Sequence, residues 1–93
     1  MQIAEIKERA ASVLSRHDVA EAYLFGSTVR REARADSDVD ILVKFKTPKG
    51  LFEHVRAKID LQDALGRQVD LVAMEALREE MKPSVDKNKV RIL

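Results

Sequence analysis

The sequence contains no cysteine, and its formal net charge at pH 7 is only +1. Without cysteine the chain has no disulfides, thiolate chemistry or cysteine-ligated zinc, and this composition fits a reducing compartment. The near balance of charge requires no polyanionic partner. No apolar run approaches the roughly 20 residues of a membrane span, and the N-terminus lacks the apolar segment of a signal peptide. We therefore expect a cytoplasmic protein without a membrane partner.

Aromatic residues and glycines are also scarce. One tyrosine and three phenylalanines leave little for a base-stacking platform, and the three glycines lack the spacing and the following lysine of a Walker P-loop. The last twelve residues carry four basic side chains against Asp86, which is more typical of a solvated helix face than of an RNA surface. Direct nucleic-acid binding is therefore the weakest of three functional hypotheses.

The 93 residues suffice for one small domain, 1–93, and their hydrophobic fraction of 45% suits a globular core. Apolar residues at steps of three and four alternate with short strand-like runs, which predicts an α+β fold with a small mixed sheet packed against helices. We expect Leu51, Phe52, Val55 and Ile59 to form the buried stripe of one helix. The predicted order is helix, strand, short helix, strand, helix, strand, helix, at 2–16, 19–25, 28–32, 39–45, 51–65, 68–73 and 74–81, with 90–93 as a last helical turn or an edge strand.

Three aspartates, Asp36, Asp38 and Asp40, stand directly before an apolar strand. Residues two apart in a strand point to the same face about 6.7 Å apart, so Asp38 and Asp40 would present their carboxylates side by side. Asp70 enters the next predicted strand in the same pattern and would join them if the two strands are neighbours. Three convergent carboxylates indicate a hard divalent cation such as magnesium. The simpler alternative is a solvated turn in which the aspartates act as caps.

Upstream, a Gly-Ser pair at 26–27 ends a predicted strand where a helix could begin. Free amides, the serine hydroxyl and the helix dipole at such a position favour a phosphate group, and glycine lets the backbone approach it closely. Arg30 and Arg34 could neutralise further phosphate charge with forked contacts, and ordinary surface charge explains either arginine equally well. A phosphate cradle beside a carboxylate-held metal pair is the equipment of phosphoryl or nucleotidyl transfer.

Together these pieces resemble the signature of the polymerase-beta nucleotidyltransferase superfamily: a Gly-Ser pair at 26–27, ten residues, an Asp-Val-Asp triplet at 38–40, and a later strand aspartate, Asp70. The wider match includes segments at 50–52 and 66–72, covers nearly the whole chain, and is similar to the minimal nucleotidyltransferase branch. The fold that this resemblance implies is the same small mixed sheet with helices.

The resemblance also implies roles for individual residues. Asp38, Asp40 and Asp70 would be the catalytic carboxylates and the ligands of magnesium, with two ions expected, and Asp70 would be placed to activate the attacking hydroxyl. The expected contacts to the nucleotide are Gly26, Ser27 and Arg30. The chain departs from the branch pattern at Arg31, where glycine is common, and at Ala35, where proline is common. Neither departure removes a ligand.

The first functional hypothesis is therefore an enzyme that uses magnesium to move AMP from ATP onto an acceptor hydroxyl. Minimal nucleotidyltransferases are commonly antitoxins paired with HEPN toxins, so the resemblance implies a HEPN-type toxin as partner and one of its tyrosines as acceptor. The alternative is a non-catalytic binding module that neutralises its partner by masking it. Small size and the departure at Arg31 motivate this second reading.

Overall fold

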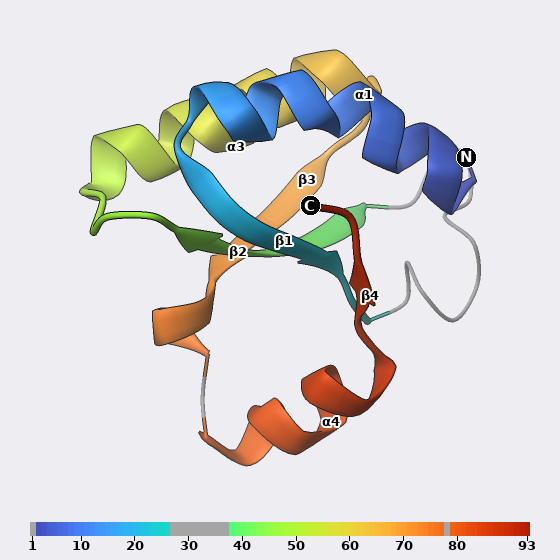
Figure 1. Cartoon of the computed structure of the whole chain (residues 1–93), viewed down its shortest axis with the longest axis vertical. Helices are drawn as coiled ribbons and strands as arrows, with labels where there is room; N and C mark the ends of the chain where they lie inside the picture. The colour runs from blue at the N-terminus through green and yellow to red at the C-terminus, as the bar shows by residue number, and fades with distance from the viewer. Residues whose placement is uncertain (1, 27–37, 78) are drawn as a thin grey trace.

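The computed structural model describes residues 2–26, 38–77 and 79–93, and these form three layers. Helices α1 and α3 cover one face of a sheet, and the C-terminal segment that contains α4 lies over the opposite face (Figure 1). The elements in chain order are α1 (Ile3–Arg16), β1 (Val19–Leu24), β2 (Val39–Phe45), α3 (Leu51–Leu65), β3 (Val69–Ala73), the 3₁₀ turns η1 (Met74–Ala76) and η2 (Glu79–Met81), α4 (Lys82–Asn88) and β4 (Val90–Arg91).

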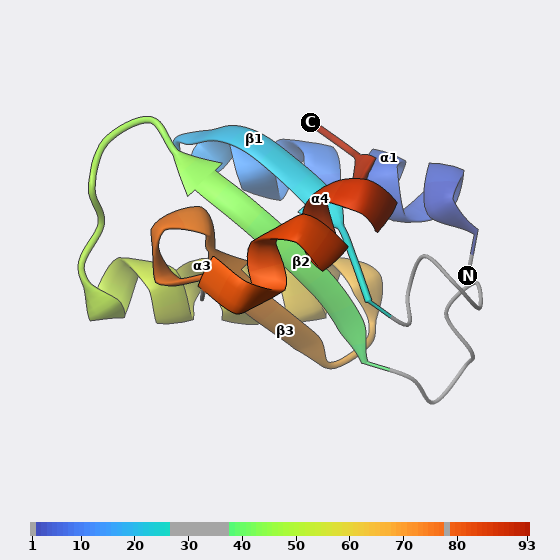
Figure 2. The ribbon, with the colours of Figure 1, turned by 90° about the horizontal axis from the view of Figure 1, so that it is seen from below.

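The sheet of the described residues has the strand order β3-β2-β1-β4 and mixes both orientations. β2 and β3 are parallel and are joined through α3, because two parallel neighbours need a long crossover connection. β1 runs antiparallel to both β2 and β4, and α4 crosses in front of the sheet when it is seen from below (Figure 2). The mixed α+β architecture predicted from the sequence is confirmed. β2 and β3 are neighbouring strands, as the predicted proximity of Asp40 and Asp70 requires.

Alternate residues of β2 build the main core. Val39, Ile41 and Val43 are each 0% exposed and belong to one cluster with both helices. Burial of this kind is the main favourable contribution to folding, at about 25 cal/mol for each Å² of apolar surface. The helical members of the cluster that are fully or nearly fully buried are Ile6, Ala10, Val13 and Leu14 of α1, and Ala57, Leu61 and Leu65 of α3.

The predicted buried stripe of α3 is wrong. Leu51, Phe52, Val55 and Ile59 are 77%, 87%, 41% and 49% exposed, respectively. Two apolar stripes run along this helix, and the one that begins at Ala57 and repeats every four residues packs on the core. Because its first member is an alanine, the sequence pattern favours the bulkier stripe, which the fold leaves in solvent.

Two side chains of α3 make hydrogen bonds to backbone groups on the outer edge of β3, which is an edge strand of the sheet. The Val69 N–H donates to Oε1 of Gln62 at 3.1 Å, and Nε2 of His54 lies 2.8 Å from the Leu71 carbonyl oxygen. These contacts occupy backbone groups that an added strand would otherwise pair with. They also tie β3, the strand that carries Asp70, to α3.

The C-terminal third differs in detail from the expected pattern. Met74–Ala76 and Glu79–Met81 form 3₁₀ turns where the sequence predicted a helix, and Val90–Arg91 is an edge strand, the second of the two predicted options. The expected short helix at 28–32 lies outside the described residues. None of the described helices has the length and apolar character needed to cross a membrane.

Candidate functional site

Asp40 and Asp70 lie side by side on the sheet face opposite α1 and α3. They are register partners in the parallel β2–β3 pair, so both side chains point to the same face from strands that are about 4.8 Å apart. Their neighbours Val39 and Val69 point the other way into the core. Asp38 immediately precedes β2, two residues before Asp40, and is exposed, as Asp70 is. The strand pairing therefore brings together two of the three predicted carboxylates and places the third beside them in sequence.

The turn at the end of β1 packs against Asp40. The Phe25 N–H donates to the Asp40 carbonyl oxygen at 3.2 Å, which ties this turn to β2. Gly26 has φ of +63°, and a Cβ built there would lie only 2.8 Å from Oδ2 of Asp40. Glycine is needed at this position both for the left-handed backbone and for the space that the carboxylate occupies. Gly26 is thus in contact with the candidate site, as the sequence predicted, although its contact with a nucleotide remains a prediction.

The donor set suits a hard cation. Carboxylate oxygens are the ligands that magnesium prefers, and Asp40 faces the space beside the Gly26 turn, where an added methyl group would collide with its oxygen. Within residues 2–26, 38–77 and 79–93, no three His, Asp or Glu side chains are arranged closely enough to hold a metal ion. The carboxylates suit magnesium by their chemistry, whereas their side chains do not converge on one point in this structure, so Asp38, Asp40 and Asp70 as the ligands of magnesium remain a prediction.

Two of the predicted nucleotide contacts cannot be compared with the structure. Ser27 and Arg30 lie outside the described residues, as do Arg34 and Asp36. Their roles remain predictions from the sequence.

Sequence reasoning missed a basic region on the same sheet face. It assigned the basic C-terminal residues to a solvated helix, whereas Nζ of Lys89 lies 4.4 Å and the guanidinium carbon of Arg91 5.9 Å from the ring centre of Tyr23. The Tyr23 hydroxyl donates to the Glu21 carboxylate, and this hydrogen bond lowers the pKa of Glu21 and raises the pKa of Tyr23. The sequence contained one signal of this basic region: side chains of a strand alternate between its faces, so Lys44 of β2 lies on the same face as Asp40.

Comparison with known proteins agrees with the resemblance inferred from the motifs. Residues 8–93 match the family model described as "Polymerase beta, Nucleotidyltransferase". A relative from Methanocaldococcus jannaschii, named "Putative protein adenylyltransferase MJ0435", is 37% identical over the whole length of both chains. A solved chain described as a "putative minimal nucleotidyltransferase" superposes with a TM-score of 0.81 at 35% identity, covering 97% of this chain and 95% of that one.

A more distant solved structure contains an MNT antitoxin in complex with a tri-AMPylated HEPN toxin of Shewanella oneidensis. Its matching chain has a TM-score of 0.76 at 21% identity, with 100% of this chain and 72% of that chain covered, so this likeness concerns the fold. The family match extends over the carboxylate-bearing strands, the Gly26 turn and nearly all of the core. The chain accordingly belongs to the polymerase-beta nucleotidyltransferase family, in its minimal nucleotidyltransferase branch, and is an enzyme of that class.

Proposed function

We propose that this protein is a magnesium-dependent adenylyltransferase that moves AMP from ATP to a tyrosine hydroxyl of a HEPN-type toxin and thereby acts as its antitoxin. The observation that supports it most strongly is the pairing of Asp40 with Asp70 beside the glycine turn that carries Gly26. Carboxylates next to a glycine turn suit a substrate in which a metal ion and phosphates are bound together, because the backbone at glycine can approach a phosphate closely.

In this proposal each group has a defined task. Bound magnesium stabilises charge on the attacking and leaving oxygens of the transferred phosphoryl group. Asp38 and Asp40 hold the metal, and the backbone at Gly26 approaches the triphosphate. Asp70 accepts the proton of the acceptor hydroxyl as its oxygen bonds to the α-phosphorus of ATP, and pyrophosphate leaves.

The partner assignment draws on the relatives. The M. jannaschii relative bears the name of a protein adenylyltransferase, and the S. oneidensis complex pairs an MNT antitoxin with a HEPN toxin that carries AMP groups. We place the activity in the cytoplasm, because the proposed reaction consumes ATP.

The direct test uses α-phosphate-labelled ATP, magnesium and the product of the gene adjacent to the one that encodes this chain, which the proposal expects to be a HEPN-type protein. Wild type should label the partner on tyrosine, and chelation of the metal with EDTA should stop the labelling. The Asp38→Asn/Asp40→Asn double variant should lose at least about 100-fold in rate, because the charges that hold the metal are gone. Asp63→Asn, an exposed aspartate on α3, is the matched control and should label normally. Equal labelling by the double variant would refute the proposed chemistry.

A non-catalytic masking module is the second candidate, and one observation favours it. Leu51, Phe52, Val55 and Ile59 form an exposed apolar stripe on α3 that could cover a partner without chemistry. Cells that express the toxin separate the two readings. If the Asp38→Asn/Asp40→Asn variant still binds the toxin but no longer protects the cells, masking is excluded; full protection by that variant would favour masking.

A further inference from the structure

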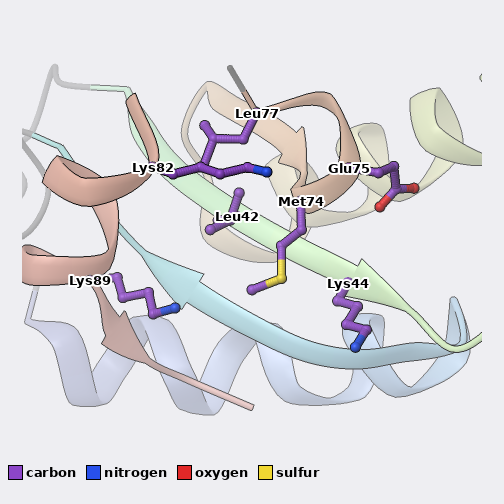
Figure 3. Close-up of a pocket in the computed structure, with 7 residues that line it drawn as sticks. All are labelled: Leu42, Lys44, Met74, Glu75, Leu77, Lys82 and Lys89. Carbon is purple, nitrogen blue, oxygen red and sulfur yellow. The ribbon is translucent and has the colours of Figure 1, made fainter. Parts of the chain in front are cut away.

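A pocket opens on the sheet face that carries the candidate carboxylates. Its volume is about 430 Å³ (Figure 3). Leu42 of β2 forms part of its wall together with Met74 of η1 and the following Leu77, and these three also pack into the small hydrophobic cluster of this face. The remaining lining residues are charged: Lys44, Glu75, Lys82 and Lys89.

The pocket lies next to the carboxylates. Leu42 follows Asp40 by two residues on β2, so its side chain emerges on the same face about 6.7 Å further along the strand. Val72 has the same relation to Asp70 on β3 and packs with Leu42 in that hydrophobic cluster. The pocket therefore lies one strand repeat, about 6.7 Å, further along β2 than Asp40.

Three lysines and one glutamate are the charged residues of the described lining, and two of the lysines also have a glutamate beside them. Each lysine comes from a different position: Lys44 projects from β2, Lys82 starts α4, and Lys89 follows α4 (Figure 3). Nζ of Lys89 lies 4.4 Å from the ring centre of Tyr23, Nζ of Lys82 lies 3.0 Å from Glu79, and Nζ of Lys44 lies 4.0 Å from Glu21. The side chains of Lys44 and Lys82 are 58% and 44% exposed, so a ligand's carboxylates can reach them beside these partners.

We propose that this pocket receives the acceptor segment, an acidic peptide stretch of the partner whose aromatic hydroxyl is the one to be adenylylated. This inference rests on the proposed function. The acceptor ring would lie on Met74 and Leu77, above the buried Leu42, with its hydroxyl directed toward Asp40 and Asp70. Acidic residues on either side of it would meet the three lysines.

The lining favours a peptide over a nucleotide. Its lysines are spread around the rim, which matches several separate carboxylates, whereas a phosphate group is usually held by converging amides or by an arginine fork. Among the described residues that line this pocket none is aromatic, so they offer no ring for a base to stack on. Methionine and leucine adapt well to an aromatic side chain, because thioether and aliphatic groups make favourable contacts with rings.

Binding can be measured on the full chain without relying on catalysis. Met74 lines the pocket, so its methyl group, labelled with ¹³C and identified through Met74→Leu, reports occupancy by NMR. The probes are two capped peptides, Glu-Glu-Tyr-Glu-Glu and Gln-Gln-Tyr-Gln-Gln, and a short oligoadenylate RNA. The acidic peptide should shift the Met74 signal and bind at least about fivefold more tightly than the neutral one.

Charge reversal supplies the matched variants. Lys44→Glu/Lys82→Glu should weaken binding of the acidic peptide about tenfold, whereas Lys7→Glu/Lys58→Glu, with both lysines outside the pocket, should leave it unchanged. Thermal unfolding confirms that each variant is folded. Equal affinity for the two peptides, no effect of the pocket reversal, or a stronger Met74 shift with the RNA than with the acidic peptide would each overturn the inference.

The two proposals fail in different ways. If the partner is labelled with AMP but the acidic peptide shows no lysine-dependent binding, the pocket assignment is wrong and the adenylyltransferase proposal stands. If the peptide binds through the lysines but neither it nor the partner is ever labelled, the proposed chemistry is wrong and the pocket still recognises acidic segments.

Discussion

The two faces of the sheet are made from alternate residues of the same strands and yet have different chemistry. Along β2, Val39, Ile41 and Val43 face the helices and are completely buried, whereas Asp40 and Lys44 lie on the other face with Leu42 between them. Side chains on the helix face are restricted by packing, so they can only be apolar. The opposite face is only partly covered, so the strands can place charges there without the cost of burying them.

The largest effect on activity is expected at Asp70, on the sheet face opposite α1 and α3, which we call the open face. Asp70→Asn removes the proposed proton acceptor and should lower the rate of AMP transfer by roughly 10²- to 10⁴-fold. The melting temperature should stay within a few degrees, because the Asp70 side chain is exposed. Single-turnover labelling with saturating ATP measures the rate, and Asp63→Asn is the control. A variant that labels as fast as wild type would show that the open face does not supply the base.

On the helix face, a substitution is expected to lower the stability of the fold. Leu61→Ala, at 0% exposure in the core, should lower the free energy of unfolding by about 2–5 kcal/mol through lost burial and a cavity. Ile59→Ala on the same helix, at 49% exposure, is the matched control and should cost less than about 1 kcal/mol. Urea denaturation of both variants measures the difference. Similar losses in the two would mean that the outward stripe of α3 is packed in solution, for instance against a second copy.

Much of this arrangement could be predicted from the sequence, because a period of two along a strand assigns its faces. The acid-then-apolar pattern around Asp40 and Asp70 predicted carboxylates beside one another, and the parallel pairing of β2 with β3 places them so. The fold class followed from the alternation of helices and strands. The family followed from the spacing of the motif pieces, and the comparisons confirm it.

The failures have physical causes. For α3, hydrophobicity alone cannot tell which of two apolar stripes faces the sheet when the buried one begins with the small residue Ala57. The sequence did not reveal the pocket, because its lining brings residues of β2 together with η1 and α4, and Met74 follows Lys44 by 30 residues along the chain. Local patterns do not record such contacts, and the basic residues near the C-terminus therefore looked like ordinary surface charge.

A smaller effect is expected at the turn that borders the open face. Gly26→Ala requires a side chain at φ of +63° and a Cβ 2.8 Å from an Asp40 oxygen, so it should cost about 1–3 kcal/mol and displace that carboxylate. Gly50→Ala is the matched control, since its φ is −78° and nothing lies within 4 Å of the added Cβ. The free energy of unfolding and the rate of AMP transfer should both fall in Gly26→Ala, and both should stay unchanged in Gly50→Ala. Unchanged transfer by Gly26→Ala would indicate that the site tolerates a shift of Asp40.

The smallest effect is expected on the helix side, at the ion pair between the end of α1 and α3. Nε2 of His17 lies 2.7 Å from Oδ2 of Asp60, and this hydrogen bond, followed by the charges of His17 and nearby arginines, lowers the pKa of Asp60. A carboxyl group whose pKa is lower in the folded protein stabilises it above the pKa of the unfolded chain, and this stabilisation is lost as pH falls through the folded value.

Wild type should therefore be more stable than Asp60→Asn near pH 6, and the gap should close as the pH falls from about 5 to about 2. Asp60 is 39% exposed, so solvent screening keeps the gap small, and salt should reduce it further. Urea titrations at several pH values measure it, with Asp63→Asn as the control. A gap that persists unchanged to pH 2 would mean that Asp60 acts through packing or neutral hydrogen bonding, because protonation would then make no difference to what the carboxyl group contributes.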